Sequence, residues 1–300
     1  MRAFLFKLIE KWPGYQEIPD NTVGFVIKQR LRLFLLYFGS WVRVKKYHKK
    51  KLYSNLKLKN SQKGKPFLLI ASGPSADEVI LETYRNNLMR NSLDVGVVNW
   101  YFESKYSKKL IPNYYFISDP VFFGKKISGL DEYFLQHPDI NLVIPFTSEK
   151  QGIINKIFYV NNLMYYKKRK ILSPMTGNLT PSSVVFHAIS FLLYLGYFPI
   201  YICGLDVSYN RNIEVNEINE IFLNKKSLYG AKSNLNSVND NLKVKLSDRD
   251  ITPRNMMEAL MNEAVMLRDL KYYNNMGLIN VGKDNTNDAL PRASLYFPNS

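Results

Sequence analysis

The polar residues best suited to chemistry in this sequence come directly after short apolar runs. The first group is Ala71-Ser-Gly-Pro-Ser-Ala76, where Gly73 permits a sharp turn and lets backbone N–H groups approach a ligand. Pro74 and Ser75 suit the start of a helix, whose first N–H groups attract anions. We expect these three residues, with Ser72, to contact a nucleotide phosphate or ribose. A structural turn explains them equally well, because the Gly-x-Gly-x-x-Gly fingerprint is incomplete.

Two further polar residues end neighbouring apolar runs. Asn99 follows residues 95–98, and Asp119 follows residues 114–118. A carboxamide and a carboxylate at adjacent strand ends can hydrogen-bond a base, a sugar hydroxyl or a phosphate-bearing group. Either residue alone is more often a cap or a turn residue, so both interpretations stay open.

A third group follows the apolar run 200–203. Gly204 and Asp206 come directly after this run, and Tyr209 lies three residues further along. We predict that Gly204 and Asp206 take part in substrate binding. Tyr209 is a candidate catalytic residue because its phenol can donate a proton to a departing phosphate, although a partly buried packing aromatic fits the same position.

Three hydroxyl residues lie at the start of a segment with helical spacing at 182–195. These residues are Thr180, Ser182 and Ser183. Together with the N–H groups of the first helical turn, they favour an anion site for a carboxylate or a phosphate. Helix capping accounts for one of the three hydroxyls but not for all of them.

The hydrophobic pattern predicts a framework that brings these groups together. Apolar runs typical of buried parallel strands occur at residues 67–71, 95–98, 114–117, 142–144, 200–203 and 278–281. Helical spacing is clearest at 182–195 and 253–276. Alternating strands and helices predict an α/β fold with a mainly parallel sheet, helices on both faces and a ligand over the carboxyl ends of the strands. Residues 210–252, rich in Asn, Lys and Ser, are predicted to form a long loop or lid inserted after a strand.

In their order, these motifs resemble the bacterial sialyltransferases of the Campylobacter type (glycosyltransferase family 42) and related flagellin-glycosylation proteins. The resemblance is carried by Ala71-Ser-Gly-Pro-Ser75, Val98-Asn-Trp-Tyr-Phe-Glu103, Ser118-Asp-Pro-Val-Phe-Phe123 and the hydroxyl residues leading into Gly204-Leu-Asp206. It covers residues 66–206 and, weakly, 278–281. It implies a Rossmann-like domain that binds CMP-sialic acid or a related CMP-sugar and transfers the sugar without a metal or another cofactor.

The resemblance also implies roles for individual residues. Donor contacts fall to the Gly73–Ser75 turn and to Asn99, and Tyr209 corresponds to a family tyrosine that assists the departure of the phosphate. Two family asparagines are replaced here by Ser72 and Asp119, so the nucleotide contacts at these positions differ from the family pattern.

The acceptor base departs from the family pattern. The family uses a histidine after the lid, whereas the histidines of this sequence are His48, His137 and His187, none of them in that region. His187 lies in an apolar helical segment, where a core or donor-pocket histidine is expected. Asp248 and Asp250 are the carboxylates placed closest to the family position, and a carboxylate base needs partial burial to raise its pKa toward working pH.

The positive charge is concentrated at the amino terminus. Residues 1–65 hold sixteen Lys or Arg and three acids, a net charge of +13 out of +16 for all 300 residues. The apolar runs 3–9 and 33–42 are shorter than the ~20 residues needed to cross a bilayer. We predict a basic amphipathic extension at 1–65, which ends in a polar linker, followed by the glycosyltransferase domain at 66–300. The basic, aromatic segment 29–46 is typical of an interfacial helix on an anionic membrane, with packing on the domain as the alternative and nucleic acid not expected.

The single cysteine, Cys203, excludes an intramolecular disulfide framework and a Cys-rich zinc site. We therefore expect a cytoplasmic protein bound peripherally at the inner membrane face. Its expected partners are a CMP-sugar, a glycan or glycolipid acceptor of the lipopolysaccharide or capsule kind, and, as an option, further copies of itself. Two other functions stay open: a pyrophosphokinase-like enzyme that uses ATP and Mg²⁺ with Asp119, and a catalytically silent partner in glycan synthesis.

Overall fold

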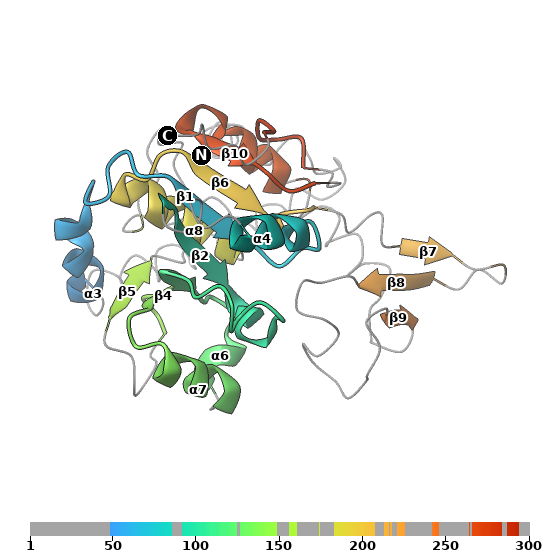
Figure 1. Cartoon of the computed structure of the whole chain (residues 1–300), viewed down its shortest axis with the longest axis horizontal. Helices are drawn as coiled ribbons and strands as arrows, with labels where there is room; N and C mark the ends of the chain where they lie inside the picture. The colour runs from blue at the N-terminus through green and yellow to red at the C-terminus, as the bar shows by residue number, and fades with distance from the viewer. Residues whose placement is uncertain are drawn as a thin grey trace, which may run out of the picture. The chain divides into compact units, whose positions relative to one another are not determined.

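The computed structural model describes residues 49–85, 92–124, 127–148, 156–160, 174, 183–207, 213–215, 217, 221–225, 242–245, 264, 266–283 and 287–293 (Figure 1). The basic segment before residue 49 lies outside these residues, and so do five candidate site residues: Thr180, Ser182, Tyr209, Asp248 and Asp250. None of the helices in the described part of the chain is both long and apolar enough to cross a membrane.

The centre of the fold is a seven-stranded sheet in which every strand pair is parallel. Its order is β10-β6-β1-β2-β3-β4-β5. The strands are β1 (Phe67–Ile70), β2 (Asp94–Val98), β3 (Tyr114–Phe116), β4 (Asn141–Pro145), β5 (Ile157–Val160), β6 (Ile200–Cys203) and β10 (Leu278–Asn280). The predicted α/β fold with a parallel, Rossmann-like sheet is confirmed, and all six predicted apolar runs form strands. The edge strand β5 was not predicted.

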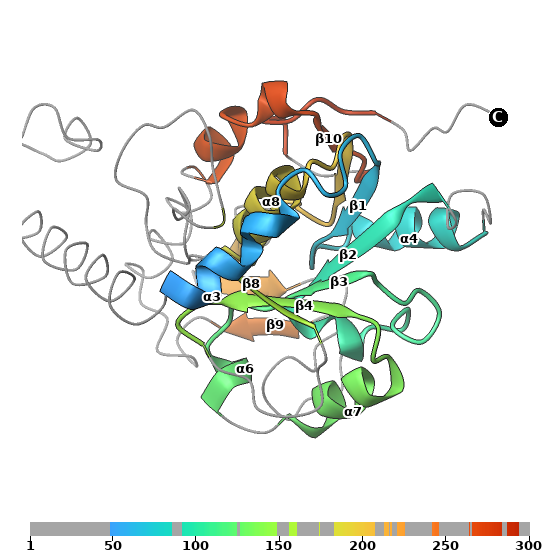
Figure 2. The same cartoon turned by 90° about the vertical axis from the view of Figure 1, so that its left-hand side faces the viewer.

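Helices cover both faces of the sheet because the strands are apolar on both sides. Along β1, Phe67 and Leu69 pack into one core, while Leu68 and Ile70 pack into the other. The first core is closed by α8 (Val184–Leu195), which buries ten of its twelve residues. The second is closed by α4 (Ala76–Arg85) and α7 (Ser128–Gln136). Figure 2 shows α4 and α8 on opposite sides of β1.

The order of the strands reverses beside β1. From β1 the chain adds β2, β3, β4 and β5 outward in one direction, whereas β6 and β10 lie on the other side of β1. Ligands of open α/β sheets bind at such a switch point, outside the carboxyl ends of the strands. The turns after β1 and β6 therefore flank the switch point, where a ligand is expected.

Residues 210–252 contain more regular structure than the sequence indicated. Three short strands, β7 (Ile213–Val215), β8 (Ile221–Lys225) and β9 (Leu242–Lys245), form a separate antiparallel sheet. The prediction of a long loop or lid did not include these strands, because strands of three to five residues are too short to produce a clear periodicity. A lid function for this region stays a prediction.

The predicted polar linker at 57–66 is also wrong as a description of this segment. After α3 (Lys49–Tyr53) and the 3-10 helix η3 (Ser54–Leu58), the chain is tied to the carboxyl end of α8. The N–H groups of Asn60 and Gln62 donate to the carbonyls of Tyr194 and Leu195 over 3.0 and 2.8 Å. These backbone bonds satisfy carbonyls at the helix end, which the polar composition of the segment does not reveal.

Candidate functional site

The turn after β1 and the turn after β6 are joined directly by hydrogen bonds. The Ser75 N–H donates to Asp206 Oδ2 over 3.0 Å, and the Ser75 hydroxyl donates to Asp206 Oδ1. The Gly204 N–H donates back to Ser75 Oγ over 3.1 Å, and the Gly73 N–H donates to the Gly204 carbonyl over 2.7 Å. Four of the residues singled out in the sequence thus form one network at the switch point, and Pro74 lies exposed between Gly73 and Ser75.

Both glycines are required by close approach of the two turns. A Cβ atom on Gly73 would lie 2.4 Å from Asp206 Oδ2 and 2.6 Å from the Gly204 carbonyl oxygen. Gly204 has a left-handed backbone, with φ +70°, and a Cβ there would lie 2.5 Å from the Ala71 carbonyl oxygen. Only glycine fits such contacts without moving the backbone of the neighbouring turn.

Asp206 is a carboxylate in a nearly closed environment, with 7% of its surface exposed. Burial raises the pKa of Asp206 above its ordinary value, while the hydrogen bonds from the Ser75 hydroxyl and N–H act in the opposite direction. The carboxylate occupies the position at the start of α4 where a bound phosphate would otherwise meet the first N–H groups. The turn therefore favours a hydroxyl-bearing ligand group over a second anion.

The raised pKa of Asp206 predicts a pH-dependent contribution to stability. The folded protein holds this proton more tightly than the unfolded chain, so the contribution is present below the ordinary aspartate pKa and is lost as the pH rises through the raised pKa. Asp206→Asn cannot ionise. The stability of this variant relative to the native protein should therefore increase as the pH rises from about 4 to about 7. Urea denaturation across this range measures the difference, and a difference independent of pH would contradict the prediction.

Asn99 and Asp119 lie at the ends of β2 and β3, on the same edge of the sheet. Asn99 Oδ1 accepts the Ser118 N–H over 3.3 Å, and the Asn99 carbonyl accepts the Tyr115 hydroxyl over 2.5 Å. Asp119 Oδ1 accepts the Val121 N–H over 3.1 Å at the start of α6 (Val121–Gly124). The side chains of Asn99 and Asp119 thus both accept backbone N–H groups in turns, which is the structural role that the sequence had left open for them. The Asn99 Nδ2 group donates to no described residue, so it is available to a ligand.

Two residues on this edge have a left-handed backbone although they are not glycine. The φ angle is 45° at Asn99 and 46° at Val207, directly after Asp206. Asparagine tolerates this region, but a β-branched valine rarely adopts it. Strained backbone of this kind is concentrated at ligand sites. The two φ angles therefore support the carboxyl edge of the sheet as the place of the functional site.

Ser183 is the N-cap residue of α8, and its hydroxyl makes no capping hydrogen bond. Because α8 connects parallel strands, it runs against them and its amino end lies at their carboxyl edge. The N–H groups of its first turn point out of a twelve-residue helix, which carries partial positive charge at this end. Of the predicted anion site, only Ser183 lies within the described residues. His187, one turn further along α8, is buried in the core as expected.

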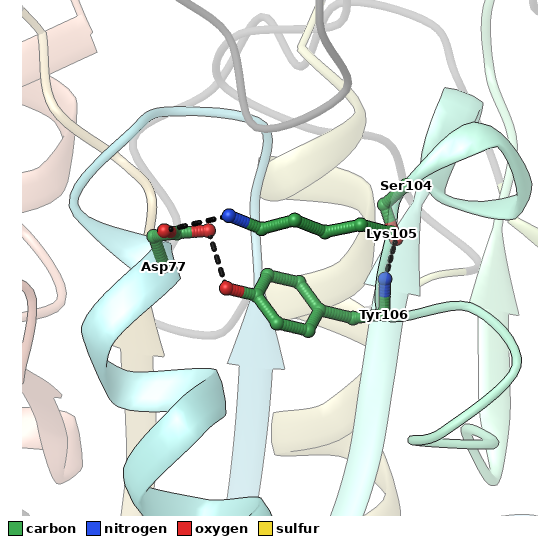
Figure 3. A network of polar contacts seen from close by, with 4 residues as sticks. All are labelled: Asp77, Ser104, Lys105 and Tyr106. Carbon is green, nitrogen blue, oxygen red and sulfur yellow. Dashed lines mark hydrogen bonds and ion pairs between the residues drawn. The ribbon is translucent and has the colours of Figure 1, made fainter.

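A cluster missed by the sequence interpretation holds the turns after β1 and β2 together (Figure 3). Asp77, in the first turn of α4, accepts the Tyr106 hydroxyl over 2.6 Å and the Lys105 ammonium over 3.0 Å. The hydrogen bond to Asp77 raises the pKa of Lys105, and burial raises the pKa of Tyr106. Lys105 is exposed, so the ion pair itself contributes little to stability. Acids in a first helical turn followed by a distant Lys-Tyr pair carry no recognisable sequence signal.

A second missed pair supports the Asp206 turn from β10. The buried Asn280 donates through Nδ2 to the Asn287 carbonyl over 3.0 Å, and Asn287 Nδ2 donates to the Leu205 carbonyl over 3.3 Å. Asn280 lies inside the apolar run predicted as a strand, and a buried amide in such a run is a signal that could have been noticed. The pair positions the backbone directly before Asp206.

The described site thus offers a buried carboxylate, an available amide donor and the amino end of a helix along one sheet edge. These groups suit a ligand with hydroxyls, a hydrogen-bonding base and a phosphate. Comparisons of the chain with models of protein families, with curated proteins and with solved structures found no match.

Proposed function

We propose that the chain is a glycosyltransferase that moves a sialic acid-like or other sugar from a CMP-activated donor to a cell-surface glycan, without a metal. The observation that carries the proposal is the network of Gly73, Ser75, Gly204 and Asp206 at the switch point of the sheet. Open α/β sheets bind nucleotides at this place, and the residues are those through which the sequence resembles CMP-dependent transferases.

The charges along the edge suggest how the donor would lie. The Ser75 N–H group already donates to the Asp206 carboxylate, which would repel a second anion placed beside it. Hydroxyl groups of a ribose, which can donate to a carboxylate, suit this end of the site. The phosphate suits the amino end of α8 near Ser183, where backbone N–H groups and the helix dipole favour negative charge.

The proposed reaction breaks the bond between the anomeric carbon and a phosphate oxygen, and CMP leaves with the bonding electrons. An acceptor hydroxyl oxygen forms the new bond to the anomeric carbon, and its proton passes to Asp248 or Asp250 while Tyr209 protonates the departing phosphate. These three residues lie outside the described residues, so their roles depend on the sequence alone. A single phosphate develops less charge than a diphosphate, and neutral donors can stabilise it.

We further propose that the basic extension at 1–65 holds the protein at the inner membrane face, where surface glycans are assembled. Its net charge of +13 would attract anionic head groups. Peripheral binding of this kind brings the transferase to membrane-bound acceptors.

The Asn99 amide gives a specific prediction. Asn99→Asp keeps the oxygen that accepts the Ser118 N–H and tolerates the left-handed backbone, but it loses the Nδ2 donor. We expect the affinity for CMP to fall by about tenfold or more, the usual effect of losing a hydrogen bond to a charged or buried ligand group. Isothermal titration calorimetry of both proteins with CMP measures this difference in affinity.

The matched control is Asn113→Asp. Asn113 Oδ1 accepts the Val95 N–H over 2.8 Å, so Asn113 links β2 to β3 where these strands begin, as Asn99 does where they end. This variant should bind CMP like the native protein. An equal loss of affinity in both variants would remove Asn99 from the donor site.

The proposed function is tested by thermal shift and calorimetry on the full chain. CMP and CMP-sugars should raise the melting temperature, because a ligand of the native state stabilises it by mass action. Release of CMP on mixing a CMP-sugar with candidate glycan acceptors should follow. Absence of CMP binding, with binding of ATP and Mg²⁺ instead, would overturn the proposal and favour a pyrophosphokinase-like enzyme.

A further inference from the structure

The segment from Lys49 to Lys65, called here the basic strap, runs from β5 past the carboxyl end of α8 to the amino ends of β1 and β6. Its last residues are bonded where β1 and β6 begin: the Phe198 N–H donates to the Lys65 carbonyl over 2.8 Å, and the Gly64 N–H donates to the Gly196 carbonyl over 2.9 Å. At its other end, the Asn55 side chain donates to the Tyr159 carbonyl in β5 over 2.5 Å. The strap is therefore an ordered part of the domain surface.

The first half of the strap has an inward and an outward face. Leu52 and Asn55 are buried, whereas Tyr53 and Leu56 are 48% and 52% exposed and Lys57 is exposed beside them. Positions 53, 56 and 57 have the i, i+3, i+4 spacing that puts side chains on one side of a helical segment. Two apolar side chains and a lysine therefore share the outward face.

A third exposed apolar side chain stands at the other end of the strap. Phe198 is 57% exposed, and its ring lies so close to Gly277 that a Cβ on that glycine would approach it to 2.2 Å. The ring thus lies against Gly277 on one side and is exposed to solvent on the other. An exposed aromatic ring is costly in water and suited to an apolar environment.

The charged side chains of the strap itself have one sign. The sequence has no Asp or Glu between Asp20 and Asp77. The strap lysines that are exposed are Lys57, Lys59, Lys63 and Lys65. Within the described residues, none of these four forms an ion pair. Lysines that surround exposed aromatic and aliphatic side chains match an anionic lipid surface, whose head groups meet the cations while the rings and Leu56 enter the acyl boundary.

We propose that the basic strap, together with Phe198, is a membrane-docking surface for anionic phospholipids. The docking itself is independent of the enzymatic activity. Its consequence, that the transferase is brought to membrane-bound acceptors, rests on the proposed glycosyltransferase function.

The contribution of the strap lysines to membrane binding is tested by co-sedimentation of the full chain with vesicles of phosphatidylcholine, with and without phosphatidylglycerol. The double variant Lys57→Gln/Lys59→Gln should lower partitioning onto the phosphatidylglycerol vesicles roughly 30-fold. This change corresponds to about 1 kcal/mol for each lysine near an anionic surface. The control Lys108→Gln/Lys109→Gln removes the same charge elsewhere on the surface and should leave partitioning unchanged. Equal losses in the two double variants would overturn the proposal.

The apolar contact is tested by Leu56→Ser against Leu135→Ser. Leu135, in α7, is 55% exposed and matches Leu56 in type and exposure. Only Leu56→Ser should weaken vesicle binding several-fold. If the strap variants instead weaken binding of a fluorescent single-stranded oligonucleotide and leave vesicle binding intact, the surface is one for nucleic acid and the proposal fails.

The contact with the bilayer is also tested with thiol probes, because the native Cys203 is fully buried and does not compete for label. A fluorophore on Leu56→Cys should be quenched by nitroxide-labelled lipids, whereas one on Leu135→Cys, in a helix on the other face of the sheet, should not. Equal quenching at both positions would refute the docking surface. Vesicle binding without CMP binding would support the docking surface while rejecting the proposed enzymatic function.

Discussion

Gly204→Ala should lower the free energy of unfolding by about 2 to 5 kcal/mol. The new Cβ would lie 2.5 Å from the Ala71 carbonyl oxygen and 2.8 Å from the Ala71 carbonyl carbon, which are backbone atoms of the neighbouring strand end. Overpacking of this kind costs about 1–3 kcal/mol, and the left-handed backbone adds about 1–2 kcal/mol for a residue with a Cβ. Urea denaturation followed by circular dichroism measures the loss.

Gly64→Ala separates the two contributions. Gly64 has φ +78°, close to the value at Gly204, but a Cβ there would meet no atom within 4 Å. This control should therefore lose only about 1–2 kcal/mol. If the two variants lost the same amount, the turn after β6 would not be packed against β1 as closely as the structure has it.

The second large effect is expected from Ser75→Ala. The variant removes the hydroxyl that donates to Asp206 Oδ1 and accepts the buried Gly204 N–H, so that N–H loses its partner. An unsatisfied buried N–H costs about 1–3 kcal/mol of stability. Because the same hydroxyl fixes the two turns to each other, the affinity for CMP should fall by about 10- to 100-fold, as calorimetry would show.

Tyr197→Phe is the matched control for Ser75→Ala. The buried Tyr197 hydroxyl donates to Asp94 Oδ2 over 2.5 Å at the start of β2, so it is also a hydroxyl paired with a carboxylate, but on the opposite edge of the sheet. Its loss should cost about 1–2 kcal/mol of stability and leave CMP affinity unchanged. A comparable fall in affinity would mean that the Ser75 effect reflects general destabilisation and not the site.

Much of the fold was predictable because strands and helices leave local patterns. The run Phe67–Ile70 is apolar at every position, as a strand buried between two helical layers requires. The helix α8 ends at Leu195 and is capped by Gly196, which adopts a left-handed φ of 89°. The edge strand β5 was not predicted because three of its four residues are only partly buried and its pattern is short. The ordered path of the strap was not predicted, because backbone hydrogen bonds to α8 hold it in place and such bonds require no particular side chains.

The candidate site was predictable as a set of positions but not as a set of contacts. Gly73, Ser75, Gly204 and Asp206 were each recognisable as residues that end a strand, since a turn must follow one. Asp77 and Tyr106 were not, because neither lies in a motif and their meeting depends on the loops after two different strands. Asn287 escaped for the same reason, since its partner is the backbone of Leu205.

The amino-acid order alone thus determined where the strands lie, where glycine turns end them and that a basic, acid-free stretch precedes the first of them. These are properties of neighbouring residues. Only the tertiary structure decided that Ser75 meets Asp206 across 131 residues of chain, that the Asp206 carboxylate fills the position expected for a phosphate, and that the strap is bonded to the carboxyl end of α8. The reason is that these contacts follow from the order and register of the strands, such as Phe67 beside Ile200, which no local pattern encodes.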